Sequence, residues 1–159
     1  MAWAKNNSVS EVDPIDLSIT TATKFNATMN HNIASGSTDI VYRVGNSSVD
    51  TGSNYAYRSS TNGAADATAT SASWIAIDSG AANPDSFIMS YFINLSGEEK
   101  LFIIFQMDQG STGAGTAPDR RETVGKWTNT SNQIDTLQVL ENGTGSLTID
   151  SNLTSLGTD

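Results

Sequence analysis

Few side chains in this chain of 159 residues could carry acid–base or nucleophilic chemistry. The sequence contains one histidine, His31, and no cysteine, which excludes a zinc ribbon, a disulfide scaffold and a cysteine nucleophile. A catalytic triad or an imidazole metal site would need His31 beside a nucleophile or a second imidazole. His31 instead shares a strand face with Phe25 and Met29, so we expect a structural, hydrogen-bonded histidine.

Paired carboxylates are the groups that glycoside hydrolases use. Glu98 and Glu99 are adjacent and follow Gly97 between two apolar segments, so we interpret them as part of a solvated hairpin turn. Asp108 ends an apolar segment and has no partner nearby in the sequence. A glycoside hydrolase or lyase would need two carboxylates about 5–10 Å apart in a cleft. A pair brought together only by folding remains an alternative, but we predict that the protein is not an enzyme.

The densest charge cluster is a run of four charged residues that begins at Asp119. Strand alternation places Arg120 and Glu122 on one face and Asp119 and Arg121 on the other. The guanidinium group of arginine pairs well with carboxylates at interfaces. The run therefore fits either ion pairs that align neighbouring subunits or an ordinary network of surface ion pairs. The Gly-rich segment 109–119 before it lacks the Gly-Lys-Ser/Thr ending of a phosphate loop, and loops of this length are usually functional or held by a neighbour.

Two further residue types could bind small ligands. Aromatic side chains stack on sugars, although in so thin a domain they are more often core or interface anchors. Oxygen-rich turns can hold calcium, but no EF-hand spacing occurs, and we predict no cofactor, with calcium kept as an alternative. The aromatic set is Trp3, Trp74, Trp127, Tyr55 and Tyr57, and the turn sets are Asp50 with Asn54, Asn62 with Asp66, and Asp78 with Asn83 and Asp85.

The elements that must position these groups have strand spacing. In 24–33, apolar side chains and His31 alternate with asparagine and threonine, which predicts a half-buried strand whose polar side chains face solvent. Large apolar residues occupy every second position of 87–95. Segment 100–107 is apolar at both alternating sets, which predicts a central strand covered on both sides. Other strands are predicted at 15–19, 40–44, 74–77, 123–128, 134–140 and 147–149, with a last edge at 153–159.

We predict an all-β fold, a β-sandwich of jelly-roll type with about eight to ten short antiparallel strands. The expected organisation is an N-terminal arm over 1–14 and a single domain over 15–159. Segment 59–73 is small and polar, and we expect it to be a loop. Leu, Ile, Val and Phe number only 32, which indicates a thin core that neighbouring subunits complete.

Composition narrows the function further. The formal net charge is −9, with 8 Lys and Arg scattered along the chain, so we expect no nucleic-acid partner. No apolar run is long enough to insert into a membrane. The first twenty residues show no signal-peptide pattern, so we expect synthesis in the cytoplasm of the producing cell. The composition is dominated by small polar residues, with 21 Ser, 19 Thr and 14 Asn.

Several stretches together resemble small β-rich virion structural proteins of marine phages and archaeal viruses. The resemblance covers most of the chain and implies a virion structural protein, without implying any catalytic residue. The stretches are 1–6 (MAWAKN), 23–26 (TKFN), 55–58 (YAYR), 62–66 (NGAAD), 97–101 (GEEKL), 113–126 (GAGTAPDRRETVGK) and 156–159 (LGTD).

We therefore expect a non-enzymatic subunit that oligomerises on a virus particle as a capsid decoration or cement protein, or as a tail or fibre component. The predicted partners are copies of itself and other virion proteins, and the predicted location is the virion. Alternatives are a lectin-like carbohydrate-binding adhesin that recognises host-surface glycans and a subunit of a cellular filament. Besides the 109–119 loop, the predicted interface residues are Trp3, Lys5, Arg120, Arg121 and Glu122.

Overall fold

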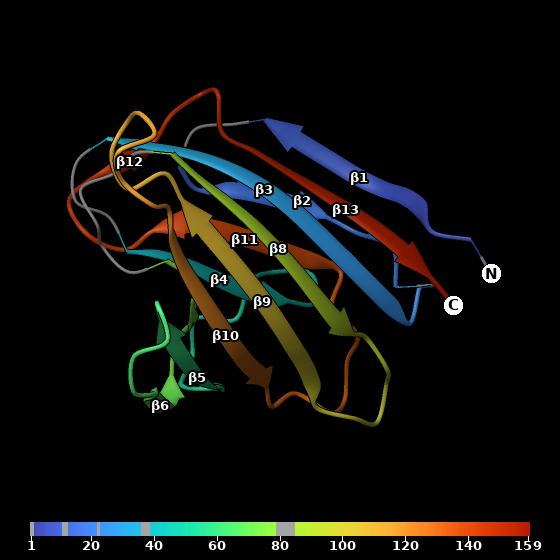
Figure 1. The fold of residues 1–159 in the computed structure, drawn as a ribbon. Helices are drawn as coiled ribbons and strands as arrows, with labels where there is room; N and C mark the ends of the chain where they lie inside the picture. The colour runs from blue at the N-terminus through green and yellow to red at the C-terminus, as the bar shows by residue number, and fades with distance from the viewer. Residues whose placement is uncertain (1, 11–12, 22, 36–38, 79–84) are drawn as a thin grey trace.

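The computed structural model describes residues 2–10, 13–21, 23–35, 39–78 and 85–159 (Figure 1). All regular structure in these ranges is β-strand, and every pair of neighbouring strands is antiparallel. This confirms the all-β prediction. The described ranges contain thirteen strands, more than the eight to ten expected. Within the described ranges, no helix is long and apolar enough to cross a membrane.

A large sheet of nine strands spans the molecule. Its order is β1-β13-β3-β8-β9-β10-β5-β6, and the short β12 also pairs with β3. Strands β8, β9 and β10 form a meander at its centre (Figure 1). The strands are β1 (Ala4–Ser10), β3 (Phe25–Ser35), β5 (Tyr55–Thr61), β6 (Ala67–Ala72), β8 (Asp85–Ile93), β9 (Lys100–Asp108), β10 (Asp119–Trp127), β12 (Ser146–Leu147) and β13 (Asn152–Thr158).

A smaller sheet of four strands packs against one face of the large sheet. Its order is β2-β11-β4-β7. The hydrophobic core lies between the two sheets, because its buried side chains come from both of them. The strands of the small sheet are β2 (Ile15–Ser18), β4 (Ile40–Gly45), β7 (Ile75–Ala76) and β11 (Thr136–Glu141). The core includes Ile15, Leu17, Tyr42, Val44 and Val139 from this sheet and Ile88, Phe92, Phe102, Ile104 and Trp127 from the large one.

Strand β3 places its polar residues inside and its apolar residues outside. Asn30 and Asn32 are fully buried, whereas Phe25 is 45% exposed and Met29 is 38% exposed. The predicted alternation is confirmed, but the prediction that its polar side chains face solvent is wrong. The prediction that β9 is covered on both sides is also wrong for the single chain, because Ile103 on its outer side is half exposed.

Hydrogen bonds between the sheets explain how the polar residues of β3 can be buried. The Thr28 hydroxyl bonds to the Tyr42 hydroxyl (2.8 Å) and to the Ser90 hydroxyl (2.5 Å). Tyr42 in turn donates to Asn30 Oδ1 (2.5 Å). Small residues of β3 and β8 thus form a polar layer around a tyrosine of the small sheet. Not every group is satisfied, because neither amide atom of Asn32 has a partner in the described structure.

Two segments that were not among the predicted strands are part of the large sheet. Residues 4–10, within the expected arm, form edge strand β1, so the strands nearest the two chain ends pair with each other (Figure 1). Asn6 Oδ1 accepts from the Thr20 N–H (3.0 Å) and fixes the other side of β1. The prediction of a loop over 59–73 is wrong, because these residues complete β5 and form β6. Their small side chains suit an edge strand that buries little.

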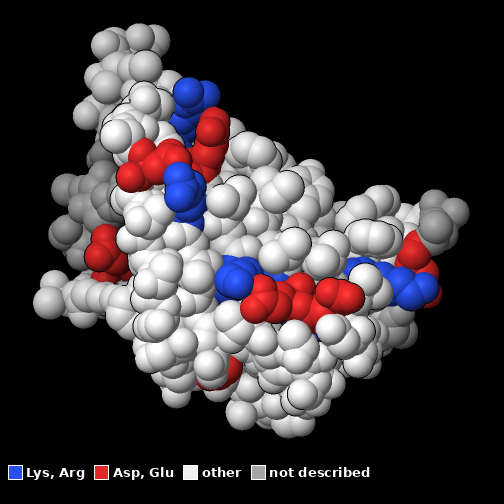
Figure 2. All heavy atoms as spheres, turned by 90° about the horizontal axis from the view of Figure 1, so that it is seen from below, with Lys and Arg blue, Asp and Glu red and all other residues white. Residues whose placement is uncertain are grey.

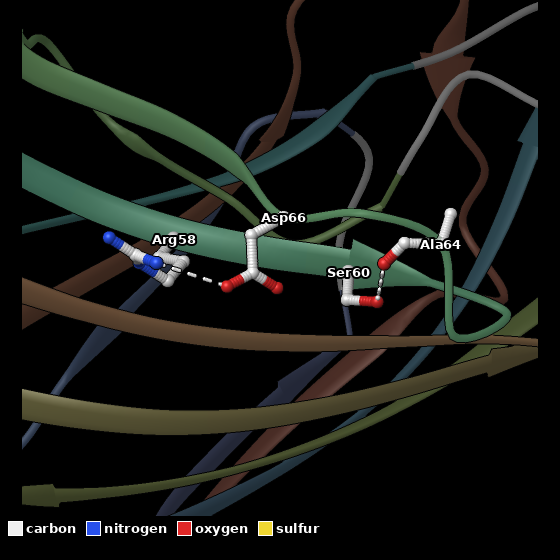
Figure 3. Close-up of polar contacts among 4 residues, drawn as sticks. All are labelled: Arg58, Ser60, Ala64 and Asp66. Carbon is white, nitrogen blue, oxygen red and sulfur yellow. Dashed lines mark hydrogen bonds and ion pairs between the residues drawn. The ribbon is translucent and has the colours of Figure 1, made fainter.

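The turn between β5 and β6 is formed by Asn62 and Gly63, as their sequence predicts. Both have positive φ, 52° and 75°, the conformation that Asn-Gly favours in tight turns. Two contacts close the hairpin (Figure 3). Ser60 Oγ donates to the Ala64 carbonyl (2.8 Å), and Arg58 Nη1 pairs with Asp66 Oδ2 (3.1 Å).

Candidate interaction surface

The groups considered for catalysis lie apart. His31 is half-buried on the outer face of the large sheet, opposite Phe87 in the strand register. Glu98 and Glu99 lie in the turn between β8 and β9, as predicted. Glu99 forms an ion pair with Lys126 (2.7 Å), which gives this carboxylate a structural partner.

Asp108 is buried at one end of the core, a placement that its sequence context does not indicate. Gln106 Nε2 donates to Asp108 Oδ2 (3.0 Å) and to Asp78 Oδ1 (3.2 Å). The Gly110 N–H donates to Asp108 Oδ1 (2.8 Å). These contacts fix the start of the Gly-rich 109–119 loop and direct Asp108 toward amide donors. We therefore interpret Asp108 as a structural residue.

The predicted interface residues are divided between two faces. Arg120 and Glu122 form an exposed ion pair (3.4 Å) on the outer face of β10. Arg121 points the other way and donates to Ser59 Oγ (2.8 Å), and burial lowers the pKa of its guanidinium. The alternation predicted for this run is confirmed. Trp3 lies beside Phe25 and Tyr91 at the outer face of the large sheet, and Lys5 lies on the edge strand β1. Both are exposed.

The aromatic residues considered for sugar binding do not form an exposed platform. Trp127 and Tyr55 are buried in the core. Tyr57 and Trp74 are partly buried, with Tyr57 packed against the core cluster and the Arg43 guanidinium 5.7 Å from the centre of the Trp74 ring. Of the residues considered, only Trp3 is exposed in the described structure. The other exposed aromatic side chains were not in the predicted set, and they are Phe25, Phe87, Tyr91 and Phe105.

The oxygen-rich turn at Asp50 is held together by its own hydrogen bonds. Asp50 accepts from the Gly52 N–H (2.8 Å), Asn54 Nδ2 (2.9 Å) and Trp127 Nε1 (2.8 Å), so its oxygens face nitrogen donors. Among the residues that the structure describes, no group of three or more His, Cys, Asp or Glu side chains could hold a metal ion. Asn83, from one of the predicted calcium sets, lies outside the described residues.

Asp50 should make the stability of the fold depend on pH. Burial raises its pKa, but the donors from Trp127, Gly52 and Asn54 outweigh that effect and lower it overall. The unfolded chain therefore takes up the proton first, so this stabilisation is present above pH ~4 and is lost as the pH falls further. We expect Asp50→Asn to lower stability at pH 7 by about 1 kcal/mol and to flatten its decline in acid.

Urea unfolding between pH 3 and 7 measures both effects. Asp66→Asn is the matched control, because Asp66 is an exposed carboxylate in a surface ion pair. It should keep the acid dependence of the wild type. Parallel pH profiles for Asp50→Asn and the wild type would contradict the assignment.

The dominant surface feature is an apolar region on the outer face of the large sheet, which we call the apolar face. It consists of large side chains on β3, β8, β9 and β10 that point away from the core and are 38–52% exposed. Exposed contiguous apolar surface of this kind marks interaction sites. Its members are Phe25, Met29, Phe87, Tyr91, Leu101, Ile103, Phe105, Met107 and Val124.

The strand register makes the apolar face continuous. Antiparallel pairing places outward side chains of neighbouring strands directly opposite one another, so they touch in rows across the sheet. Residues at every second position of β9 thus meet residues of β8 on one side and of β10 on the other. The rows include Phe87 with Met107, Met89 with Phe105, Tyr91 with Ile103, and Ile103 with Val124.

Two grooves flank the centre of the apolar face. Leu101 and Ile103 line both of them, so this part of β9 is a ridge between the grooves. One groove, of about 510 Å³, extends toward Trp3 and Phe25. The other, of about 530 Å³, extends across Val124 to the β5–β6 hairpin. The apolar face is therefore not flat, because it has a central ridge with a groove on each side.

Charged residues border the apolar face on the side of β10 and β5. The described residues contain three ion pairs, and all three have a member on one of these strands: Arg58–Asp66, Arg120–Glu122 and Lys126–Glu99. Each pair is neutral, so the ion pairs at this margin carry no net charge although the chain as a whole carries −9. Figure 2 shows charged side chains in small clusters of both signs within otherwise uncharged surface.

The apolar face is the feature that our sequence predictions missed. The residues were assigned to the correct strand faces, but those faces were expected to be inside. A signal was available in the second face of each strand. In 24–33 the second face carries Asn and Thr, in 87–95 it combines Ile88 and Phe92 with small polar residues, and 100–107 is apolar on both faces.

No protein-family model, curated protein or solved structure matches the chain. The fold and its surfaces are therefore the basis for a functional proposal.

Proposed function

We propose that this protein is a non-enzymatic structural subunit of a virus particle, used as a capsid decoration or cement protein or in a tail or fibre. The apolar face carries the proposal. At about 200 Å² for a whole large apolar side chain, nine that are roughly half exposed present on the order of 800 Å². Contiguous apolar patches on monomers are usually about 300–600 Å², so a surface of this size favours a subunit built to be covered.

We also propose that the two sheets form a widened jelly roll. For this assignment, the eight strands of the jelly roll are β2 to β7, β10 and β11. The order β2-β11-β4-β7 then places the first, last, third and sixth of these eight strands side by side, which is the order of one jelly-roll sheet. In the other sheet, β3 and the neighbours β10, β5 and β6 take the remaining places. Strands β8 and β9 are then an inserted hairpin between β3 and β10. This assignment supports a virion role by analogy only, because jelly rolls also occur in lectins and cupins.

Location of the protein in particles tests the proposed function. Mass spectrometry of purified particles from the source of the sequence should detect the chain at a fixed copy number relative to the major capsid protein. Cryo-EM of the same particles should show density for two packed sheets. Absence of the chain from purified particles would refute the virion role.

A further inference from the structure

We propose that the apolar face binds a second copy of this chain, forming a two-fold symmetric dimer in which two large sheets pack face to face. This inference names the partner of the surface on which the proposed function rests. Three properties of the face favour a second copy: its area, its relief and its charge.

The area matches what a stable dimer needs. The apolar face presents on the order of 800 Å² of apolar side chain, and a standard interface buries about 800 Å² on each partner. Its residues are mainly aromatic side chains, Met, Ile and Leu, and aromatic residues and Met are enriched at interfaces. Two such faces would pack as sheets do inside a β-sandwich, about 10 Å apart.

The relief of the face offers both a protrusion and depressions. A two-fold interface brings the same patch of both subunits together, so each protrusion must meet a matching depression. The ridge formed by Leu101 and Ile103 has a groove on each side, and the two grooves have nearly equal volumes of about 510 and 530 Å³. In the proposed dimer, the ridge of each subunit enters a groove of the other.

Charge also favours this face over the rest of the surface. Two copies that each carry −9 repel one another, and the repulsion is smallest where the contacting surfaces are neutral. The apolar side chains carry no charge, and the bordering Arg120–Glu122 and Lys126–Glu99 pairs are neutral. An anionic membrane surface would repel the chain for the same reason.

Sedimentation equilibrium of the full chain with the substitution Ile103→Asp tests the proposal. Ile103 lies at the centre of the face and is half exposed, so the change should leave the fold intact, which circular dichroism and thermal unfolding can verify. Because symmetry places the new carboxylate in the interface twice, we expect the dissociation constant to rise at least ~100-fold. Ile149→Asp is the matched control, because Ile149 is 68% exposed and lies outside the four strands of the face, and it should leave the constant unchanged.

Cross-linking provides a second measurement that does not depend on tolerance of a buried charge. The chain has no cysteine, so Ile103→Cys introduces a single reactive thiol. A short bis-maleimide should link two copies of Ile103→Cys but not two copies of Ile149→Cys. The proposal is overturned if the wild type is monomeric at all concentrations, if Ile103→Asp dimerises like the wild type, or if the face binds neutral phosphatidylcholine vesicles in place of a second copy.

These results separate the dimer from the virion role. A monomeric protein that is found in particles would overturn the dimer and leave the proposed function standing, with another virion protein on the face. A dimer dependent on Ile103 in a protein absent from particles would support the interface and refute the virion role.

Discussion

Truncation of Trp127 to alanine is expected to lower the free energy of unfolding by about 4 kcal/mol. Trp127 ends β10, is only 1% exposed and is among the largest fully buried side chains of the core. Its removal leaves a large cavity between the sheets. It also removes the Nε1–H donor to Asp50 (2.8 Å), a residue that shapes the loop before β5.

Trp127→Phe separates packing from hydrogen bonding. Phenylalanine keeps much of the buried ring but cannot donate to Asp50, so its cost should be about 1–2 kcal/mol. Urea unfolding at pH 7 measures both variants. Equal losses for Trp127→Ala and Trp127→Phe would show that the hydrogen bond, not the buried volume, accounts for the contribution of the side chain.

Truncation of Lys100 to alanine should cost about 3 kcal/mol, although lysine is usually a surface residue. Lys100 is fully buried at the start of β9. Its ammonium donates to the carbonyls of Glu98 (2.6 Å) and Asn129 (2.9 Å) and lies 5.9 Å from the centre of the Trp127 ring. It therefore joins the β8–β9 turn to the segment after β10. Burial lowers the pKa of this ammonium, and the charge of Glu98 partly opposes that shift.

Lys100→Met is the matched control, because methionine keeps most of the apolar stem and removes the charged donor. We expect it to cost about 2 kcal/mol, since two backbone carbonyls lose their partner while the packing is largely retained. Thermal and urea unfolding measure the two variants together. A loss below 0.5 kcal/mol for Lys100→Ala, typical of surface substitutions, would show that the carbonyls find other donors.

The strands were predictable, whereas the side of each strand that faces the core was not. Alternation in 24–33 and 87–95 identified β3 and β8 because a period of two is a local property. The pattern has no direction, however, and the choice of side depends on partners distant in sequence. Thr28 can be buried because its hydroxyl forms hydrogen bonds with Tyr42 of the small sheet and with Ser90 of the neighbouring strand β8.

Predictions about candidate site residues divided in the same way. The opposite faces of Arg120 and Arg121 follow from adjacent positions on a strand, and the structure confirms them. The partners of Asp50 and Glu99 could not be predicted, because Trp127 and Lys126 approach them only through the register of β10 with its neighbours. The edge strand β6 was missed because alanine and threonine alternate there with little apolar contrast.

The alternation of β3 has a consequence for how its sequence can vary. The interior of the single chain determines which residues fit at Asn30, which is buried beside Tyr42. The surroundings of the outer face determine which residues fit at the adjacent Met29. Two selective pressures therefore act on adjacent codons of one strand. Drift at even-numbered positions is limited by the interior of the subunit. If a second copy covers the outer face as proposed, drift at odd-numbered positions is limited by a surface that must change together with its partner.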